Sequence, residues 1–449
     1  MSMARQGWML LLIAACAAAE RDAVNVLARF GEMVRGNASH IPNFTCVETI
    51  ERQYYRARLS TAPRNCDDLA AEKKKRGYKL TLESADRLRL DVRAGITAEM
   101  YSWPGANRFD DRDLWDIIGY GPAASGPFAA SLLEVVQGDA TDFAFLDETE
   151  AGGRKLLQYS FRVPAERSHY FIYMPQGAVA TAWDGTLLID PETSELARMT
   201  TRTSELPPEA LACELTTASD YGRVSLGGRE FPLSRETRQR FIDRSGDEVE
   251  NIVTFSACRA YQAESRVSFG ATPEDAPAGP AKPVPARGLD LPAGLPVTIE
   301  LSAGIDSATA AGGDRFTGRL AKPILDDRKK MLVPEGSVVA GRLIEVAVRM
   351  QPREVAIVLN VETVRIDGAE TAFHVAGRTP SSRGGEWLRE ILSSLTIGGG
   401  GSHSGGSASG ITITDHPPAP EGELNVLRFS GTRKVLEPGF KTEWVTVKP

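Results

Sequence analysis

Five cysteines are the side chains of this sequence best suited to covalent chemistry. Four of them form an even set, which in an oxidising compartment predicts two disulfides with any of three connectivities. They are Cys46, Cys66, Cys213 and Cys258. None lies in a Cys-X-X-Cys motif, so the pattern favours neither redox exchange nor a zinc knuckle. The alternative is that these are free thiols packed as small hydrophobic side chains.

The other side chains that could carry catalysis follow no known pattern. The motifs GxSxG, HExxH, GxGxxG and the P-loop are absent. The five histidines have no helical ligand spacing, so we expect no metal and no cofactor. The acidic run at 110–113 lacks the glycine and distal glutamate of an EF-hand loop and is interpreted as solvated. The sequence therefore predicts a non-enzymatic protein, with a secreted hydrolase of unrecognised site as an alternative.

Aromatic side chains on expected strands carry the sharpest binding hypothesis. Tyr159 and Phe161 alternate with polar residues, which is typical of a strand with one apolar face. The candidate ligand-binding set is Phe143, Phe145, Tyr159, Phe161, Phe171, Tyr173 and Trp183. On an open sheet these rings would face an acyl chain, whose burial contributes about 0.8 kcal/mol per CH₂. The competing interpretation is that they form an ordinary core beneath helices.

The first 19 residues have the layout of a secretory signal peptide. Arg5 precedes an apolar stretch at 8–15 that is too short to span a membrane, and small residues follow to Ala19. Cleavage there would release a chain that starts at Glu20. Alternatively, the segment Ile-Ala-Ala-Cys ending at Cys16 resembles a bacterial lipobox, which would place a lipid on that cysteine. Both routes lead to the periplasm or cell envelope.

Composition fits an ordinary globular protein. The 449 residues hold 52 Lys and Arg against 59 Asp and Glu, a formal charge of −7. This mild acidity argues against nucleic acid as a partner, because such proteins concentrate basic side chains on one face. Beyond the leader, no stretch reaches the ~18 apolar residues of a transmembrane helix, so we expect no membrane span in the mature chain.

Two low-complexity segments divide the chain. A Pro/Ala linker at 270–290 separates an α+β sheet domain at 20–269 from a β-domain at 291–397. A Gly/Ser-rich tract at 398–410 then precedes a C-terminal strand pair at 411–449.

Local patterns predict the elements of the first domain. Apolar residues from Ala23 to Val34 recur at helical spacing, and Gly36 and Asn37 are expected to end that helix. A strand follows through Arg56. Asn65 can cap a second helix, whose basic end at 73–76 we interpret as solvated rather than as a polyanion site.

From 78 to 269 the pattern mostly alternates, with turns at 227–228 and 245–247, which indicates an antiparallel α+β sheet. The domain at 291–397 is almost wholly strand-like and is expected to form a small all-β barrel or sandwich.

Two resemblances follow from these residues. The strand–turn–strand at 183–193, Trp-Asp-Gly-Thr-Leu-Leu-Ile-Asp-Pro-Glu-Thr, within 20–270 resembles the half-barrel of LolA-type periplasmic lipoprotein carriers. The segments 41–46 and 254–261 resemble parts of uncharacterised exported bacterial proteins. The segments Leu-Pro-Ala-Gly at 291–294 and Leu-Val-Pro-Glu-Gly-Ser at 332–337 resemble the β-barrel domain of TrbI/VirB10-like conjugation proteins, a likeness that covers 291–376.

The first resemblance implies an envelope protein that binds lipid or another apolar ligand in its half-barrel. The leading hypothesis adds that the second domain docks to an envelope protein partner. The alternative is a structural or interaction module with no small ligand. The shape of the first sheet, open over an apolar hollow or closed over a packed interior, distinguishes the two.

Overall fold

The computed structural model describes residues 3–94, 99–106, 109, 114–118, 123–125, 130–137, 141–174, 177–203, 206, 212–260, 289, 291–378, 410–412 and 424–448, and the side chains of most of these. The linker at 270–290, apart from 289, the tract at 398–409 and the acidic run at 110–113 lie outside them. Within the part described, no helix is both long and apolar enough to cross a bilayer.

Ten antiparallel strands form the sheet of the first region. In spatial order they are β5 (Asp142–Ala151), β6 (Arg154–Val163), β9 (Trp183–Ile189), β10 (Leu196–Thr203), β11 (Ala212–Leu226), β12 (Arg229–Asp243), β13 (Glu248–Ala260), β1 (Phe44–Arg58), β2 (Lys79–Ala94) and β3 (Glu99–Ser102). The expected hairpin turns at 227–228 and 245–247 join β11 to β12 and β12 to β13, which confirms an antiparallel meander.

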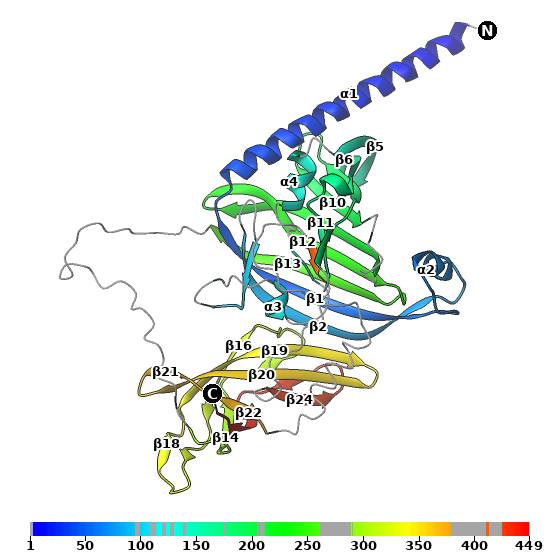
Figure 1. Cartoon of the computed structure of the whole chain (residues 1–449). Coiled ribbons are helices and arrows are strands. Elements are labelled where there is room, and N and C mark those ends of the chain that lie inside the picture. Colours follow the sequence, from blue (N-terminus) through cyan, green and yellow to red (C-terminus); the bar gives the residue numbers. More distant parts are fainter. Residues whose placement is uncertain are drawn as a thin grey trace, which may run out of the picture.

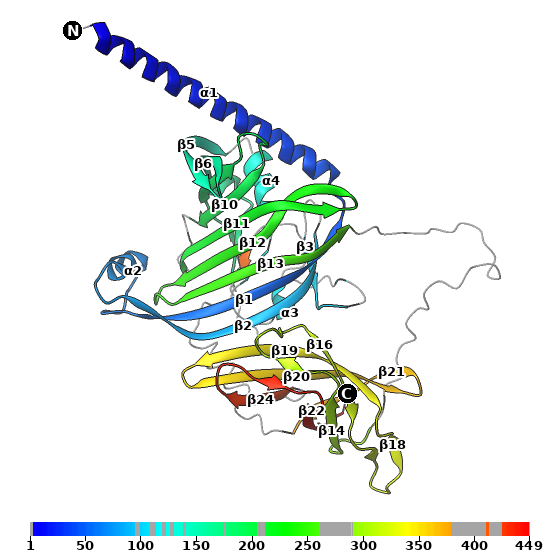
Figure 2. The same cartoon turned by 180° about the vertical axis from the view of Figure 1, so that it is seen from behind.

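The sheet curves, and smaller elements lie on its inner side (Figures 1 and 2). These are α3 (Leu114–Ile118), α4 (Ala130–Gln137) and a four-stranded sheet of β4 (Ala123–Ser125), β23 (Gly410–Thr412), β7 (Phe171–Met174) and β8 (Gly177–Ala180). A 3₁₀ turn, η1 (Ala165–Arg167), precedes β7. We therefore describe the first region as one large antiparallel sheet whose inner face is covered by short elements.

The first helix is longer than its pattern predicts. Helix α1 (Met3–His40) runs through the expected leader and past Gly36 and Asn37, so the predicted stop was wrong. The backbone N–H of Ile41 donates to the Asn37 carbonyl at 2.8 Å, which continues the helical ladder. Pro42 ends the helix, because a proline disfavours helical geometry in the residue before it. Cys16 lies within α1, and its side chain is outside the described part.

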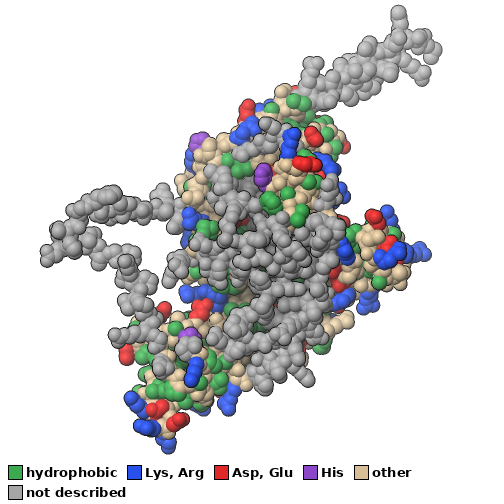
Figure 3. All heavy atoms as spheres, viewed as in Figure 1, with side chains coloured by type: hydrophobic (Ala, Val, Ile, Leu, Met, Phe, Trp, Pro, Cys, Tyr) green, Lys and Arg blue, Asp and Glu red, His purple; other side chains and the backbone are tan. Residues whose placement is uncertain are grey.

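Helix α2 (Cys66–Lys73) forms where it was predicted. The Asn65 side chain accepts a hydrogen bond from the Asp68 N–H at 2.8 Å, which is the expected N-cap. Lys73 pairs with Glu248 at 2.9 Å, so part of the basic end is tied to β13. Charged side chains of both signs gather on this projecting helix in Figure 3.

The second region contains strands around its own apolar core. The pairings run β24 (Asn425–Ser430), β20 (Arg353–Ile366), β19 (Val338–Met350), β16 (Arg315–Leu320), β14 (Pro296–Leu301), β26 (Lys441–Thr446) and β22 (Val375–Gly377). Strand β21 (Ala369–Ala372) extends β20, and two small ladders join β15 (Ile305–Asp306) to β25 (Val435–Leu436) and β17 (Ile324–Leu325) to β18 (Met331–Val333). Among the described strands β24 pairs with β20 and β22 pairs with β26, and the ladder is not closed by a pairing of β22 with β24, so a closed barrel is not shown.

The C-terminal strands do not pair with one another as a hairpin. Strand β24 pairs with β20, whereas β26 pairs with β14 and β22. The two expected strands therefore occupy separate places in the ladder of the second region, β24 beside β20 and β26 between β14 and β22. Turn signals and alternation define each strand locally, but they do not identify its partner.

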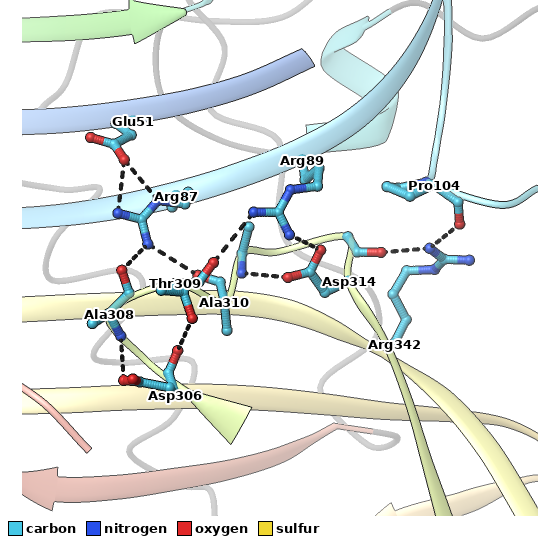
Figure 4. A network of polar contacts seen from close by, with 12 residues as sticks. Glu51, Arg87, Arg89, Pro104, Asp306, Ala308, Thr309, Ala310, Asp314 and Arg342 are labelled. Carbon is cyan, nitrogen blue, oxygen red and sulfur yellow. Dashed lines mark hydrogen bonds and ion pairs between the residues drawn. The ribbon is translucent and has the colours of Figure 1, made fainter. Parts of the chain in front are cut away.

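The two regions share one continuous sheet, because β19 pairs with β2 at 347–349. Figure 4 shows the polar contacts beside this pairing. Arg87 donates to the Ala308 carbonyl at 2.7 Å, and Arg89 pairs with Asp314. Arg342 donates to the carbonyls of Pro104 and Gly313 at 3.2 and 2.7 Å. The junction is thus built from contacts between segments more than 200 residues apart.

Candidate functional site

An aromatic wall lines the inner face of β6 and β9. Trp183 stacks on Tyr170 with ring centroids 5.6 Å apart and meets Phe161 edge to face at 5.4 Å. Tyr159 lies beside Phe145 at 5.7 Å, also edge to face. Such pairs add stabilisation beyond the apolar area that they bury. The wall belongs to the largest apolar cluster of the first region.

Helix α1 covers this wall. Its residues Ala23, Val26, Phe30 and Val34 form one buried stripe in the same cluster. In Figures 1 and 2 the helix runs beside α4, and it contacts α4, β5 and β9. The aromatic wall is therefore covered by α1, by α4 and by the segment around β7, which contributes Tyr170 and Ile172.

A few polar contacts hold α1 on the sheet. The Tyr159 O–H donates to the Ala23 carbonyl at 2.7 Å, and burial raises the pKa of this phenol to about 12, so it remains a donor. Arg29 donates to Ser194 at 3.1 Å and to the Pro191 carbonyl at 3.2 Å. Residues 41–43 link the helix directly to β1.

A belt of buried polar side chains crosses the middle of the same face. Arg52 on β1 donates two hydrogen bonds to Asp86 on β2, at 2.7 and 2.8 Å, and the neighbouring strands contribute Asn251, Gln239 and Thr237. Asn251 donates to Gln239 at 3.4 Å. On one side of this belt lies the aromatic cluster, and on the other lies a second apolar cluster that includes Phe44, Ile50 and α3. The inner face therefore alternates apolar, polar and apolar surface.

The second cluster contains an unusual buried acid. Glu48 on β1 is 1% exposed, and neither of its carboxylate oxygens has a hydrogen-bond partner among the residues that the structure describes. Burial, reinforced by the charge of Glu99, raises the pKa of Glu48 well above its ordinary value. Tyr101 donates to Glu99 at 2.5 Å, and burial raises the pKa of this phenol as well.

The outer face carries a separate hollow of about 520 Å³. Threonines 186, 200 and 216 contribute to its lining, and Arg202, Arg238 and Arg240 stand among them. Each arginine is paired with a carboxylate, at 3.4 Å to Asp184, 2.9 Å to Glu236 and 2.8 Å to Glu248 respectively. Because these charges are matched within the sheet, we regard this hollow as secondary to the inner face.

The four candidate cysteines form two disulfides, Cys46–Cys258 and Cys66–Cys213. The first joins β1 to β13 beside a register shift in their pairing, and the second ties α2 to β11. Sequence spacing left three connectivities open, and only the fold selects among them. Disulfides of this kind are typical of an oxidising compartment.

The structure brings together most of the predicted aromatic residues. Tyr159, Phe161 and Trp183 are buried in the aromatic cluster, and Phe143 and Phe145 pack against it. Phe171 lies on β7, where its neighbour Ile172 enters the cluster instead. Tyr173 is on the same strand, and its side chain is outside the described part.

Sequence reasoning missed Tyr170, Tyr54, Glu48 and Glu99. A signal existed for one of them. Glu48 occupies an inward position between Cys46 and Ile50 in the alternation of β1, where an apolar residue is expected. The other three are identified only by pairings between distant strands.

Comparisons with known proteins give fold similarities alone, since no family model and no curated protein matches. The chain is similar to a LolA superfamily protein from Nitrosomonas europaea, with 9% identity and a TM-score of 0.25 over 52% of this chain and 94% of that one. It is also similar to a DUF1329 family protein from Desulfovibrio piger, with 9% identity and a TM-score of 0.26 over 55% of this chain and 95% of that one. These comparisons lend no support to a TrbI/VirB10-like segment at 291–376.

Proposed function

We propose that this is an exported envelope protein that binds an acyl chain or a similar apolar ligand between α1 and the aromatic wall. The observation that supports this proposal is the construction of the cover. Helix α1 contributes to the cover through a narrow apolar stripe and a few hydrogen bonds. Displacing α1 would uncover the part of the wall that it packs against, where Tyr159 bonds to it.

The energetics favour exchange of the helix for a ligand. An acyl chain regains apolar burial at about 0.8 kcal/mol per CH₂, which offsets the loss of the α1 stripe. The polar contacts of α1 each contribute only about 1 kcal/mol net. The two disulfides lie away from this cover and hold the sheet while the helix moves.

The test removes one hydrogen bond that holds α1 on the sheet and keeps the aromatic wall apolar. Tyr159→Phe removes the hydrogen bond to Ala23, and we expect it to bind a fluorescent fatty acid about fivefold more tightly, equivalent to about 1 kcal/mol. Tyr55→Phe is the matched control, because the Tyr55 hydroxyl bonds Gln53 away from the wall.

Lipid co-extracted with the purified protein, detected by mass spectrometry, is the second expected result. Protein that is free of lipid and does not bind the probe in any variant would contradict the proposal.

A second candidate is an interaction module with no small ligand. It is supported by the complete burial of Trp183 and Tyr159, each 1% exposed, in a packed cluster. In that case the second region would dock to an envelope partner and the helix would never open. Hydrogen exchange separates the two functions, because an opening lid predicts faster exchange in α1 than in β6.

A further inference from the structure

Glu48 is a buried acid, and the inward side chains beside it on β1 are apolar or disulfide-bonded, namely Phe44, Cys46 and Ile50. A carboxyl group buried without a hydrogen-bond partner destabilises a protein, whereas leucine there would stabilise the cluster. A side chain that lowers the stability of the fold, at a position where an apolar side chain would raise it, indicates a role in binding.

A second carboxylate and a phenol lie on the same face of the sheet as Glu48. Glu99 and Tyr101 on β3 pair with Ala94 and Val92 on β2, and Val92 in turn pairs with Cys46. Cross-strand partners share a face of the sheet, so these side chains lie on the same inner face as Glu48. The Tyr101 hydroxyl donates to Glu99 at 2.5 Å, which places the phenol and the second carboxylate side by side.

We propose that Glu48 and Glu99 bind the ammonium group of an amphipathic amine whose chain lies on the aromatic wall. This inference rests on the proposed function and names the ligand's head group. Ionised carboxylates only accept hydrogen bonds and an ammonium group only donates them, so the bound amine would stabilise the ionised form of Glu48, which burial disfavours in the ligand-free protein. Phenol rings attract cations through their faces. A divalent cation such as calcium requires six to eight oxygen ligands, which two glutamates and a phenol do not supply.

The spacing suits such a ligand. Tyr54, which belongs to the aromatic cluster, is six residues from Glu48 on β1, about 20 Å at ~3.3 Å per residue. Both side chains point to the inner face, because their separation is even. The site for the ammonium group at Glu48 and the site for the chain at the aromatic cluster therefore lie on one face of the sheet, on opposite sides of the polar belt.

The experiment compares three ligands of equal chain length by calorimetry with the full chain. We expect hexadecylamine to bind at least tenfold more tightly than hexadecanol or hexadecanoate. Glu48→Gln should remove that preference and leave hexadecanol binding unchanged. Glu83→Gln is the control, because Glu83 is half-exposed and paired with Arg56.

Each outcome separates the two proposals. Equal binding of all three probes by the wild type would overturn the ammonium site and support the apolar site alone. No binding of any probe would overturn both. Glu48→Leu should melt at a higher temperature than the wild type and also lose the amine preference. A lower melting temperature would instead show that Glu48 serves the fold and would overturn the inference.

Discussion

At the scale of single residues, Glu48 predicts how stability depends on pH. Its folded pKa lies well above the ordinary value of 4.5. Folding therefore favours the protonated form, and the carboxyl destabilises the protein progressively as pH rises from about 4.5 towards the folded pKa. Glu48→Gln, which never ionises, should raise the melting temperature at pH 8 and have a smaller effect at pH 5.

The difference between variant and wild type isolates this one group from others that titrate nearby. Glu248 shifts in the opposite direction, because Arg240, Lys73 and Tyr78 stabilise its charged form and lower its pKa despite burial. The stabilisation that Glu248 contributes is lost as pH falls. Because the wild type and Glu48→Gln both contain Glu248, this contribution cancels in the difference between their melting temperatures. A difference in melting temperature that stays constant from pH 5 to pH 8 would contradict the assignment.

At the scale of elements, the disulfide between α2 and β11 should stabilise the sheet. It closes a loop of 147 residues, and Leu69 of α2 packs against the turn between β12 and β13. Replacing both Cys66 and Cys213 with alanine should lower the free energy of unfolding by about 2–4 kcal/mol. Denaturant titration measures this change.

The N-cap of the same helix supplies a control. Asn65→Ala weakens α2 and leaves the crosslink intact, so it should lower the unfolding free energy by about 1 kcal/mol. If both changes had the same effect, the loss would come from the helix, and the crosslink would contribute nothing.

Elements with strong local signals were predictable from sequence. Asn65 and the acidic first turn define α2, and glycines at 227–228 and 246 mark the two long hairpins. Elements defined by distant partners were not. The pairing of β24 with β20 and the identity of the cysteine pairs depend on contacts more than 50 residues apart. The candidate site was also predictable only in part. Glu48 breaks the apolar alternation of β1, which the sequence shows, whereas Glu99 is placed near Glu48 only by the pairing of β3 with β2.

At the scale of the whole molecule, the merged sheet makes the two regions one structural unit. A Pro/Ala linker in the sequence predicts independent domains, and linker composition alone contains no information about docking. The described contacts instead join β2 to β19 and place Arg342 over Trp103, with the guanidinium 5.7 Å from the ring centroid. We therefore expect a single cooperative unfolding transition.

Gly313 lies at the centre of this junction and provides the test. Its φ is +102°, and a Cβ atom would stand 2.2 Å from the Arg89 carbonyl oxygen and 2.9 Å from the Trp103 ring. Gly313→Ala should therefore force β2 away from the second region and split the thermal transition into two. Gly368→Ala is the matched control, because its φ is +83° but nothing lies within 4 Å of the added Cβ. It carries similar backbone strain without the junction contact, so it should lower the melting temperature within one transition. If Gly313→Ala also unfolds in one step, the shared sheet does not couple the two regions.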